Sequence, residues 1–307
     1  MRKLLCILYL LVLWGLAPGS LYAQQDPHYT QYRYNLSVVN PAYAGSQGLW
    51  STSIMYRRQW SSLEGAPVTY TLASHSPLNE KVGVGLSVIR DQLGPVEETN
   101  IYGDFSYTIP VGQDNYLSFG LKAGVTLHDV GLSDLFVLDP LDPFFTQDIS
   151  NAYPNVGVGL FYSTWDYFIS FSIPNLINAV HLDENGLKYG SEVSHFFLAG
   201  GLVHQLSDQI TIRPSTMIKG AFGAPWSFDL NFNMLFLDTV EAGVSYRLND
   251  SFSGLLGVWV NDTVRIGYAY DGIISPLSAG ALSSHEIILS FDLQFKDNGR
   301  GIPPRFL

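Results

Sequence analysis

The sequence predicts an all-β protein, a transmembrane antiparallel β-barrel of about 14 strands that is preceded by a cleaved signal peptide. Three observations predict it. Apolar and polar residues alternate with a period of two in many successive runs, as in strands with one apolar and one polar face. The N-terminus resembles an export signal. Charged residues make up only 14% of the chain, against roughly 25% in an ordinary soluble domain.

Residues 1–23 form the expected signal peptide. Arg2 and Lys3 supply a positive start, residues 4–16 are apolar, and Ala23 offers a small residue for cleavage. The apolar stretch is shorter than the roughly 20 residues of a membrane-spanning helix, which disfavours an uncleaved anchor. Cys6 is the single cysteine of the sequence and leaves with the signal. The mature chain is therefore expected to have neither disulfides nor thiol chemistry.

The rest of the chain is divided into three parts. Residues 24–48 are polar and aromatic, end in a turn-rich stretch, and are expected to form a periplasmic segment that leads into the barrel. Residues 49–296 are expected to form the outer-membrane barrel, and residues 297–307 a periplasmic tail. The strand-like runs of the barrel have these approximate centres: Ile54, Thr71, Leu86, Phe105, Leu121, Val158, Ile169, Leu198, Ser215, Leu230, Val244, Leu256, Gly267 and Leu289.

The last run, residues 284–295, shows the alternation clearly. Ile287, Leu289 and Phe291 share one face, whereas Ser290 and Asp292 share the other. In a soluble β-sandwich the apolar face would be the core. In an outer-membrane barrel it would face lipid, and the polar face would line the lumen. Aromatic residues cluster near the ends of the runs, where their rings suit the headgroup zone, and this favours the membrane barrel.

The lengths of the connections also favour the membrane barrel. Three long connections, near residues 129–152, 174–194 and 272–283, are all odd-numbered in chain order, and the even-numbered connections are brief. If both termini are periplasmic, the odd-numbered connections are extracellular, and the extracellular side is where such barrels have their longer loops.

Ten charged residues are expected to point into the lumen, five acids and five bases. In a low-dielectric interior such charges must pair or stay hydrated, so a balanced set suits cross-lumen pairing and a narrow or plugged pore. They are Asp104, Lys122, Arg213, Lys219, Asp229, Glu241, Arg247, Arg265, Asp271 and Asp292.

No motif predicts a metal, a cofactor or nucleic acid as a ligand. The net charge is -11 without a basic run, which gives no support for nucleic-acid binding. His195 and His204 are nine residues apart, so they lie on opposite faces of a strand rather than at zinc-ligand spacing. Asp139, Asp142 and Asp148 could bind Ca²⁺ but lack the spacing of a calcium loop, and a solvated loop is the alternative. Nucleophile-elbow and phosphate-loop motifs are absent from the sequence.

A set of short motifs runs in order along most of the mature chain. Gln31-Tyr32 is followed by Asn40-Pro41-Ala42-Tyr43-Ala44-Gly45, then Arg58-Gln59-Trp60, Gly65-Ala66-Pro67, His75-Ser76-Pro77, Asp91-Gln92-Leu93-Gly94-Pro95 and finally Ser284-His285-Glu286-Ile287. As an ordered set they resemble the PorP/SprF family of outer-membrane proteins of the type IX secretion system and gliding machinery. Single pieces are unspecific, since Asn-Pro-Ala-Tyr alone would be an ordinary turn.

The resemblance implies a non-enzymatic component in the outer membrane of a Bacteroidetes-like Gram-negative bacterium. It implies export or surface anchoring of proteins with a type IX C-terminal signal, and contacts with periplasmic ring or lipoprotein components of the machinery. Outer-membrane lipid is the remaining expected partner. Two rival functions stay open: a passive channel or transporter for small or apolar solutes, and an outer-membrane hydrolase that assembles its residues from separate strands.

Six residues of these motifs are candidates for partner binding: Asn40, Pro41, Tyr43, Arg58, Trp60 and Gly65. Arg and Trp are enriched at binding hot spots, and Arg58 and Trp60 are expected at the outer end of the first strand. The alternative is that Gly65 and its neighbours set turn geometry and that Trp60 belongs to the aromatic girdle.

Overall fold

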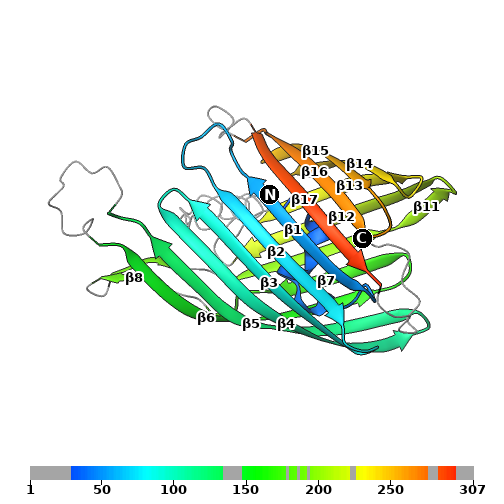
Figure 1. Ribbon diagram of the computed structural model, residues 1–307, viewed down its shortest axis with the longest axis horizontal. Helices are drawn as coiled ribbons and strands as arrows, with labels where there is room; N and C mark the ends of the chain where they lie inside the picture. Colours follow the sequence, from blue (N-terminus) through cyan, green and yellow to red (C-terminus); the bar gives the residue numbers. More distant parts are fainter. Residues whose placement is uncertain are drawn as a thin grey trace, which may run out of the picture.

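The protein is a closed antiparallel β-barrel in the computed structural model (Figure 1). The structure describes residues 29–133, 147–177, 180–184, 187–191, 194–221, 226–275 and 283–294. The expected signal peptide 1–23 and tail 297–307 lie outside these residues, as do Asp139 and Asp142. No helix in the described parts of the chain is long and apolar enough to cross a membrane.

The barrel wall has 14 strand positions. Each strand pairs with its neighbours in chain order, and β1 pairs with β17 to close the wall. β10 and β11 both pair with β12 and occupy one position, separated at Val203, while β8 and β9 form a separate hairpin. All 14 expected centres fall within wall strands, so the predicted fold class is confirmed. The wall strands are β1 (Trp50–Arg58), β2 (Val68–Pro77), β3 (Val82–Leu93), β4 (Val96–Gly112), β5 (Asn115–Val130), β6 (Ile149–Ser163), β7 (Tyr167–Ile173), β10 (His195–Leu202), β11 (His204–Ser207), β12 (Ile210–Ala221), β13 (Ser227–Phe236), β14 (Val240–Arg247), β15 (Ser251–Trp259), β16 (Val264–Ile273) and β17 (Ser283–Leu293), and the hairpin consists of β8 (Val180–Glu184) and β9 (Leu187–Ser191).

The wall has an apolar outer face and a largely polar inner face, as the alternation predicts. Ile54, Leu121 and Phe232 are exposed on the outside, at 48%, 61% and 43% of their surface. Their sequence neighbours point inward and are buried. A continuous exposed apolar band of this kind would aggregate in water, whereas in a bilayer it meets acyl chains.

The outward residues of β13 are expected to lie at different depths in the membrane. Phe232 lies in the middle of β13, whereas Phe228 lies on the same face near one end of that strand. We expect Phe232→Arg to lower the free energy of unfolding by about 2–4 kcal/mol and Phe228→Arg by only about 0–1 kcal/mol, because the cost of an outward cation falls toward the headgroups. Urea unfolding in phospholipid vesicles measures both. Equal costs would contradict the depths assigned here to Phe228 and Phe232 in the membrane.

The connections differ between the two ends of the barrel. The ends of β5, β7 and β16 are joined to the next wall strand by the three long connections, and all three leave the same end. At the other end β4 and β5 are separated only by residues 113–114, and β13 and β14 only by residues 237–239. The end with the long connections is therefore extracellular and the end with the short turns periplasmic.

Residues 29–48 lie inside the barrel. They form three short helical turns: η1 (Tyr32–Asn35), α2 (Leu36–Val39) and η2 (Pro41–Tyr43). We call residues 29–48 the lumen segment. Its apolar side chains pack against inward-facing Met55, Phe161 and Ile288 of the wall, and together they form the buried apolar core. Residues 24–28 of the expected periplasmic lead-in segment lie outside the described residues. Residues 29–48 of that segment lie within the barrel and not in the periplasm, because their apolar and polar partners are on the inner face of the wall.

Candidate functional site

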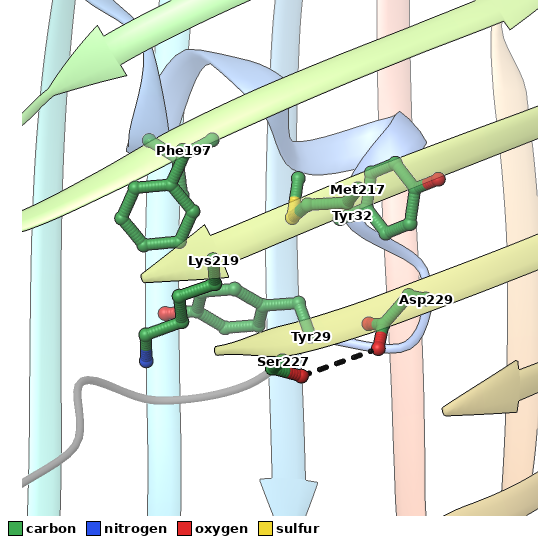
Figure 2. Close-up of a pocket in the computed structure, with 8 residues that line it drawn as sticks. Tyr29, Tyr32, Phe197, Met217, Lys219, Ser227 and Asp229 are labelled. Carbon is green, nitrogen blue, oxygen red and sulfur yellow. Dashed lines mark hydrogen bonds between the residues drawn. The ribbon is translucent and has the colours of Figure 1, made fainter. Parts of the chain in front are cut away.

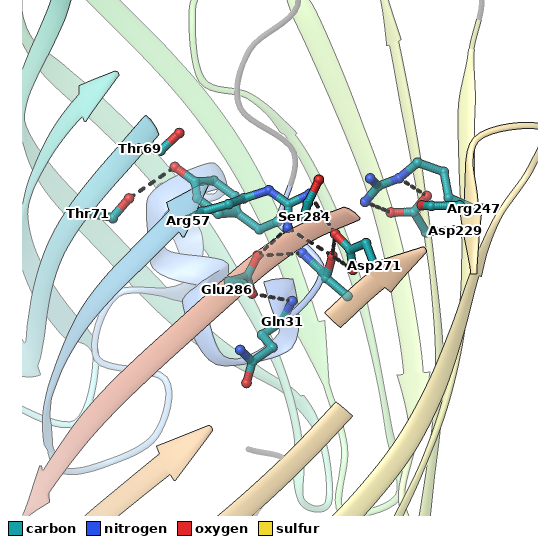
Figure 3. A network of polar contacts seen from close by, with 12 residues as sticks. Gln31, Arg57, Thr69, Thr71, Asp229, Arg247, Asp271, Ser284 and Glu286 are labelled. Atoms are coloured by element: carbon teal, nitrogen blue, oxygen red, sulfur yellow. Dashed lines mark hydrogen bonds and ion pairs between the residues drawn. The ribbon is translucent and has the colours of Figure 1, made fainter. Parts of the chain in front are cut away.

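The most extensive polar network joins the start of the lumen segment to the extracellular half of the wall (Figure 3). Arg57 of β1 contacts Asp271 of β16 at 2.8 Å and Glu286 of β17 at 3.0 Å. The two oxygens of Glu286 accept the backbone N–H groups of Thr30 and Gln31 at 2.9 and 2.8 Å. The hydroxyl of Thr30 donates to Asp271 at 2.8 Å. One cation and two carboxylates therefore hold the segment to three adjacent strands.

This network is almost completely removed from solvent. The side chains of Arg57, Asp271 and Glu286 are exposed by 2%, 1% and 0%. Charges buried to this degree are tolerable only when they are paired and their remaining donors and acceptors are satisfied. The lumen segment contributes to this satisfaction through two backbone N–H groups and one hydroxyl. Its docking and the burial of the three charges therefore depend on each other.

A second group of contacts fixes η1 against β12, β14 and β16. The Tyr32 hydroxyl donates to Ser215 at 3.0 Å, and Arg33 donates to the backbone oxygen of Arg213 at 3.1 Å. The Tyr34 hydroxyl donates to Glu241. The guanidinium of Arg265 lies 3.3 Å from the centre of the Tyr34 ring, close enough for a cation–π contact.

The end of the lumen segment packs against the periplasmic half of β5, β6 and β7. The amide nitrogen of Asn40 donates to the Ser170 hydroxyl at 2.7 Å and to the backbone oxygen of Leu160 at 2.9 Å. Its amide oxygen accepts the N–H of Ala42, which caps η2. A Cβ on Gly120 would overlap the backbone of Pro41 and Ala42. The missing side chain at Gly120 therefore lets this turn lie directly on the wall.

The structure places nine of the ten predicted lumen charges in buried positions, and Asp292 is half-buried. Lys122 and Asp104 pair at 2.9 Å across β4 and β5. Arg247 holds Asp229 through two nitrogens at 2.8 and 2.9 Å across β13 and β14, and Arg265 lies 3.4 Å from Glu241. The pairs thus run along the wall between strands of one side. They do not cross the lumen as expected, because the lumen segment fills the space between opposite walls.

The six candidate partner-binding residues are not brought together. Asn40, Pro41 and Tyr43 are buried within the barrel. Arg58 and Gly65 are exposed at the extracellular end, and Trp60 is half-buried there with a φ of 45°. The first three therefore hold the lumen segment in place, and the last three lie on an accessible surface.

Sequence reasoning missed Arg57, Glu286 and the contacts of Thr30. The signal was present, because Arg57 alternates with Met55 and Ser53, and Glu286 alternates with Ile288. All of these are inward-facing and buried.

A small pocket remains beside the lumen segment (Figure 2). It lies between Tyr29 and Tyr32 of the segment and Phe197, Met217 and Asp229 of the wall. It has room for about a single water molecule. A pocket of this size does not provide a path for a solute.

The described residues include no cluster of three or more His, Cys, Asp or Glu side chains placed to hold a metal ion. His195 is buried in the wall and His204 is exposed, so the two do not share a site. Asp148 is exposed and accepts the backbone N–H of Ser133 at 2.9 Å.

Comparison with known proteins gives one family match. The family described as "Type IX secretion system membrane protein PorP/SprF" matches residues 21–291, which is most of the chain. No curated protein matches the sequence.

Several solved outer-membrane barrels are similar at low identity. The Acinetobacter baumannii outer membrane protein Omp33 has a TM-score of 0.49 at 7% identity, over 80% of this chain and 98% of its own. A Pseudomonas aeruginosa FadL homologue has a TM-score of 0.49 at 12% identity, over 89% and 96%. The P. putida toluene transporter TodX has a TM-score of 0.48 at 10% identity, over 86% and 94%.

Proposed function

Because this chain belongs to the PorP/SprF family of type IX secretion system membrane proteins, we propose that it is a non-enzymatic component of that machinery in the outer membrane. In this role it supports export or surface anchoring of proteins with a type IX C-terminal signal, and it contacts periplasmic ring or lipoprotein components. Gliding motility is part of the same proposal, since the family resemblance implies it.

The observation that carries this proposal is the occupied lumen. The lumen segment lies within the barrel and holds wall residues through Glu286 and Asp271 near one end and Ser170 near the other. An open channel for small or apolar solutes needs a continuous path that binds its solute only weakly. Packed side chains and paired charges occupy the described part of that path instead. This supports a role in handling proteins over passive transport.

The two ends of the barrel suit different partners. The short turns, such as residues 113–114 and 237–239, form a compact periplasmic surface that suits stable contact with a ring component. The long connections after β5, β7 and β16 are at the extracellular end, where exported proteins would be held.

The test is deletion of the gene followed by complementation. We expect the deletion to abolish surface display of proteins with a type IX C-terminal signal, measured by protease shaving and mass spectrometry of intact cells. Permeability to small antibiotics and dyes should stay unchanged, because the wild-type lumen is occupied. The full-length gene should restore display.

Two results would contradict the proposal. One is a deletion strain that still displays all its type IX cargo. The other is a steady open conductance of the purified wild-type protein in a planar bilayer, which would favour a passive channel. Co-purification from detergent-solubilised outer membranes identifies the periplasmic and exported partners.

A further inference from the structure

The distribution of positive charge on this barrel is uneven. The structure describes ten Lys and Arg side chains, and seven of them are buried. The exposed ones are Arg58, Lys81 and Arg90. Lys81 lies in the periplasmic turn between β2 and β3. Arg58 and Arg90 lie on the outer face of β1 and β3 near the extracellular end. In a chain of net charge -11, two of the described side chains are therefore outward cations at the level of the outer leaflet.

Tyrosines surround these two cations on adjacent strands. Tyr56 of β1 pairs with Tyr70 of β2, and their ring centres are 5.2 Å apart. Tyr70 in turn lies opposite Arg90 of β3 in the strand register. Tyr56, Tyr70 and Arg90 therefore form a row across three strands on one face. Arg58 lies on the same face of β1, two residues nearer the extracellular end.

The row continues on the other side of β1. Arg58 pairs with His285 of β17, and His285 pairs with Tyr270 of β16. The Tyr268 hydroxyl and the Nδ1 of His285 are 2.7 Å apart, and the Tyr270 and His285 rings meet edge to face at 5.4 Å. These contacts join Tyr268, Tyr270 and His285 on the outer face. β16, β17, β1, β2 and β3 lie side by side in one wall (Figure 1).

We define the outer-leaflet patch as Arg58, Arg90, Tyr56, Tyr70, Tyr270 and His285. Apolar Ile54 and Leu72, two residues nearer the periplasm on β1 and β2, are exposed at 48% and 44% and begin the lipid-facing band. The patch therefore lies at the boundary between acyl chains and headgroups. Tyr rings favour this boundary, and Arg side chains there reach toward the headgroups.

Arg58 and Arg90 differ in whether they already have an ion-pair partner. Arg58 makes no ion pair with any of the residues that the structure describes. Arg90 forms an ion pair with Glu97 at 2.7 Å, but the Arg90 side chain is 55% exposed and that of Glu97 is 32% exposed. An exposed pair of this kind is worth little, and the fork of Arg90 keeps donors for a second acceptor.

We propose that the outer-leaflet patch binds the phosphorylated headgroup of an outer-leaflet lipid. Arg58 and Arg90 supply charge-assisted hydrogen bonds to phosphate, for which the planar guanidinium is well suited. The tyrosine hydroxyls supply further donors, and the apolar band below accommodates the acyl chains. The occupant is a membrane lipid rather than a free phosphate, because the patch is continuous with the lipid-facing surface.

The experiment uses the purified full-length protein in phosphatidylcholine nanodiscs with a small fraction of probe lipid. The probes are diphosphorylated lipid A and the same lipid A without its phosphates. Lipid retained on the barrel is counted by native mass spectrometry. We expect the wild type to retain the phosphorylated probe. Arg58→Gln/Arg90→Gln should retain about thirtyfold less, since each of the two cations near an anionic headgroup contributes about 1 kcal/mol.

Two variants control for charge and folding. Lys81→Gln removes one exposed cation at the periplasmic end and should retain the phosphorylated probe like the wild type. Arg58→Lys/Arg90→Lys keeps both charges and should retain most of it. Heat-modifiable migration on gels shows that each variant is a folded barrel.

Three results would overturn the proposal. The first is equal retention by the wild type and the Gln double variant. The second is equal retention of the two forms of lipid A, which would mean that the acyl chains alone are bound. The third is displacement of the probe by millimolar inorganic phosphate, which would mean that the site takes free phosphate and has no preference for a lipid.

Discussion

Arg57→Met is expected to lower the free energy of unfolding by about 3–5 kcal/mol, the cost of breaking a buried ion pair from one side. The variant leaves Asp271 and Glu286 without the cation that lies 2.8 and 3.0 Å from them. Both carboxylates remain buried, and water does not readily replace a guanidinium there. Urea titration of the barrel in phospholipid vesicles, followed by heat-modifiable migration, measures the loss.

The adjacent residue is a matched control. Arg58 is the next residue of β1, points outward and makes no ion pair with a described residue. Arg58→Met should lower the free energy of unfolding by no more than about 1 kcal/mol, the contribution of one cation near a headgroup, and so by clearly less than Arg57→Met. A triple variant, Arg57→Met with Asp271→Asn and Glu286→Gln, should recover much of the loss, because the buried charges are then gone together. Equal losses for Arg57→Met and Arg58→Met would contradict the proposed network.

Gly120→Val is expected to displace the lumen segment and open the barrel. The new side chain would overlap Pro41 and Ala42. The wall cannot move aside easily, because β5 is paired along its whole length with β4 and β6. If the overlap costs roughly 3 kcal/mol, the undocked fraction rises by about two orders of magnitude. We expect stepwise currents in a planar bilayer where the wild type is silent. Trypsin should also cleave after Arg33, which is buried in the native structure.

Gly103→Val controls for the loss of a strand glycine. Gly103 lies on β4 with its Cβ position toward lipid, and the nearest atom to an added Cβ is the Ala123 oxygen at 3.8 Å. This variant should remain silent and resist trypsin at Arg33. Matching behaviour of the two variants would show that the segment is not held by close contact at Gly120.

The wall of the barrel could be predicted from the sequence, and the lumen segment could not. A bilayer favours an apolar outer face along every strand, so the period of two in runs such as 117–127 is a direct consequence of the environment. Loop lengths then indicated which end is extracellular. The position of residues 29–48 depends instead on partners such as Glu286 and Ser170, which are more than 100 positions away in sequence. Nothing local in a polar, turn-rich segment indicates such partners.

For the site residues too, the face of the wall could be predicted from the sequence, whereas the interaction partners could not. Alternation placed Asp104 and Lys122 on the inner face, but it could not say that they pair with each other, because their partners depend on the register between strands. Arg58 was expected at the outer end of the first strand, and it lies there as the last residue of β1. The buried role of Arg57 was missed, although its inward position follows from the same period.

The polar network also spans the seam of the barrel, where the first wall strand meets the last. Arg57 belongs to β1, Glu286 belongs to β17, and Thr30 and Gln31 attach to the same glutamate. During biogenesis the ring of strands must be sealed at this junction, and the donors that neutralise its carboxylate come from the N-terminal part of the folding chain. Glu286 takes part both in the contact between β1 and β17 and in the docking of residues 30 and 31. Closing the seam and docking the segment are therefore coupled, and each makes the other more favourable. A barrel with a closed seam and an empty interior is therefore less favourable than one in which residues 30 and 31 are docked on Glu286.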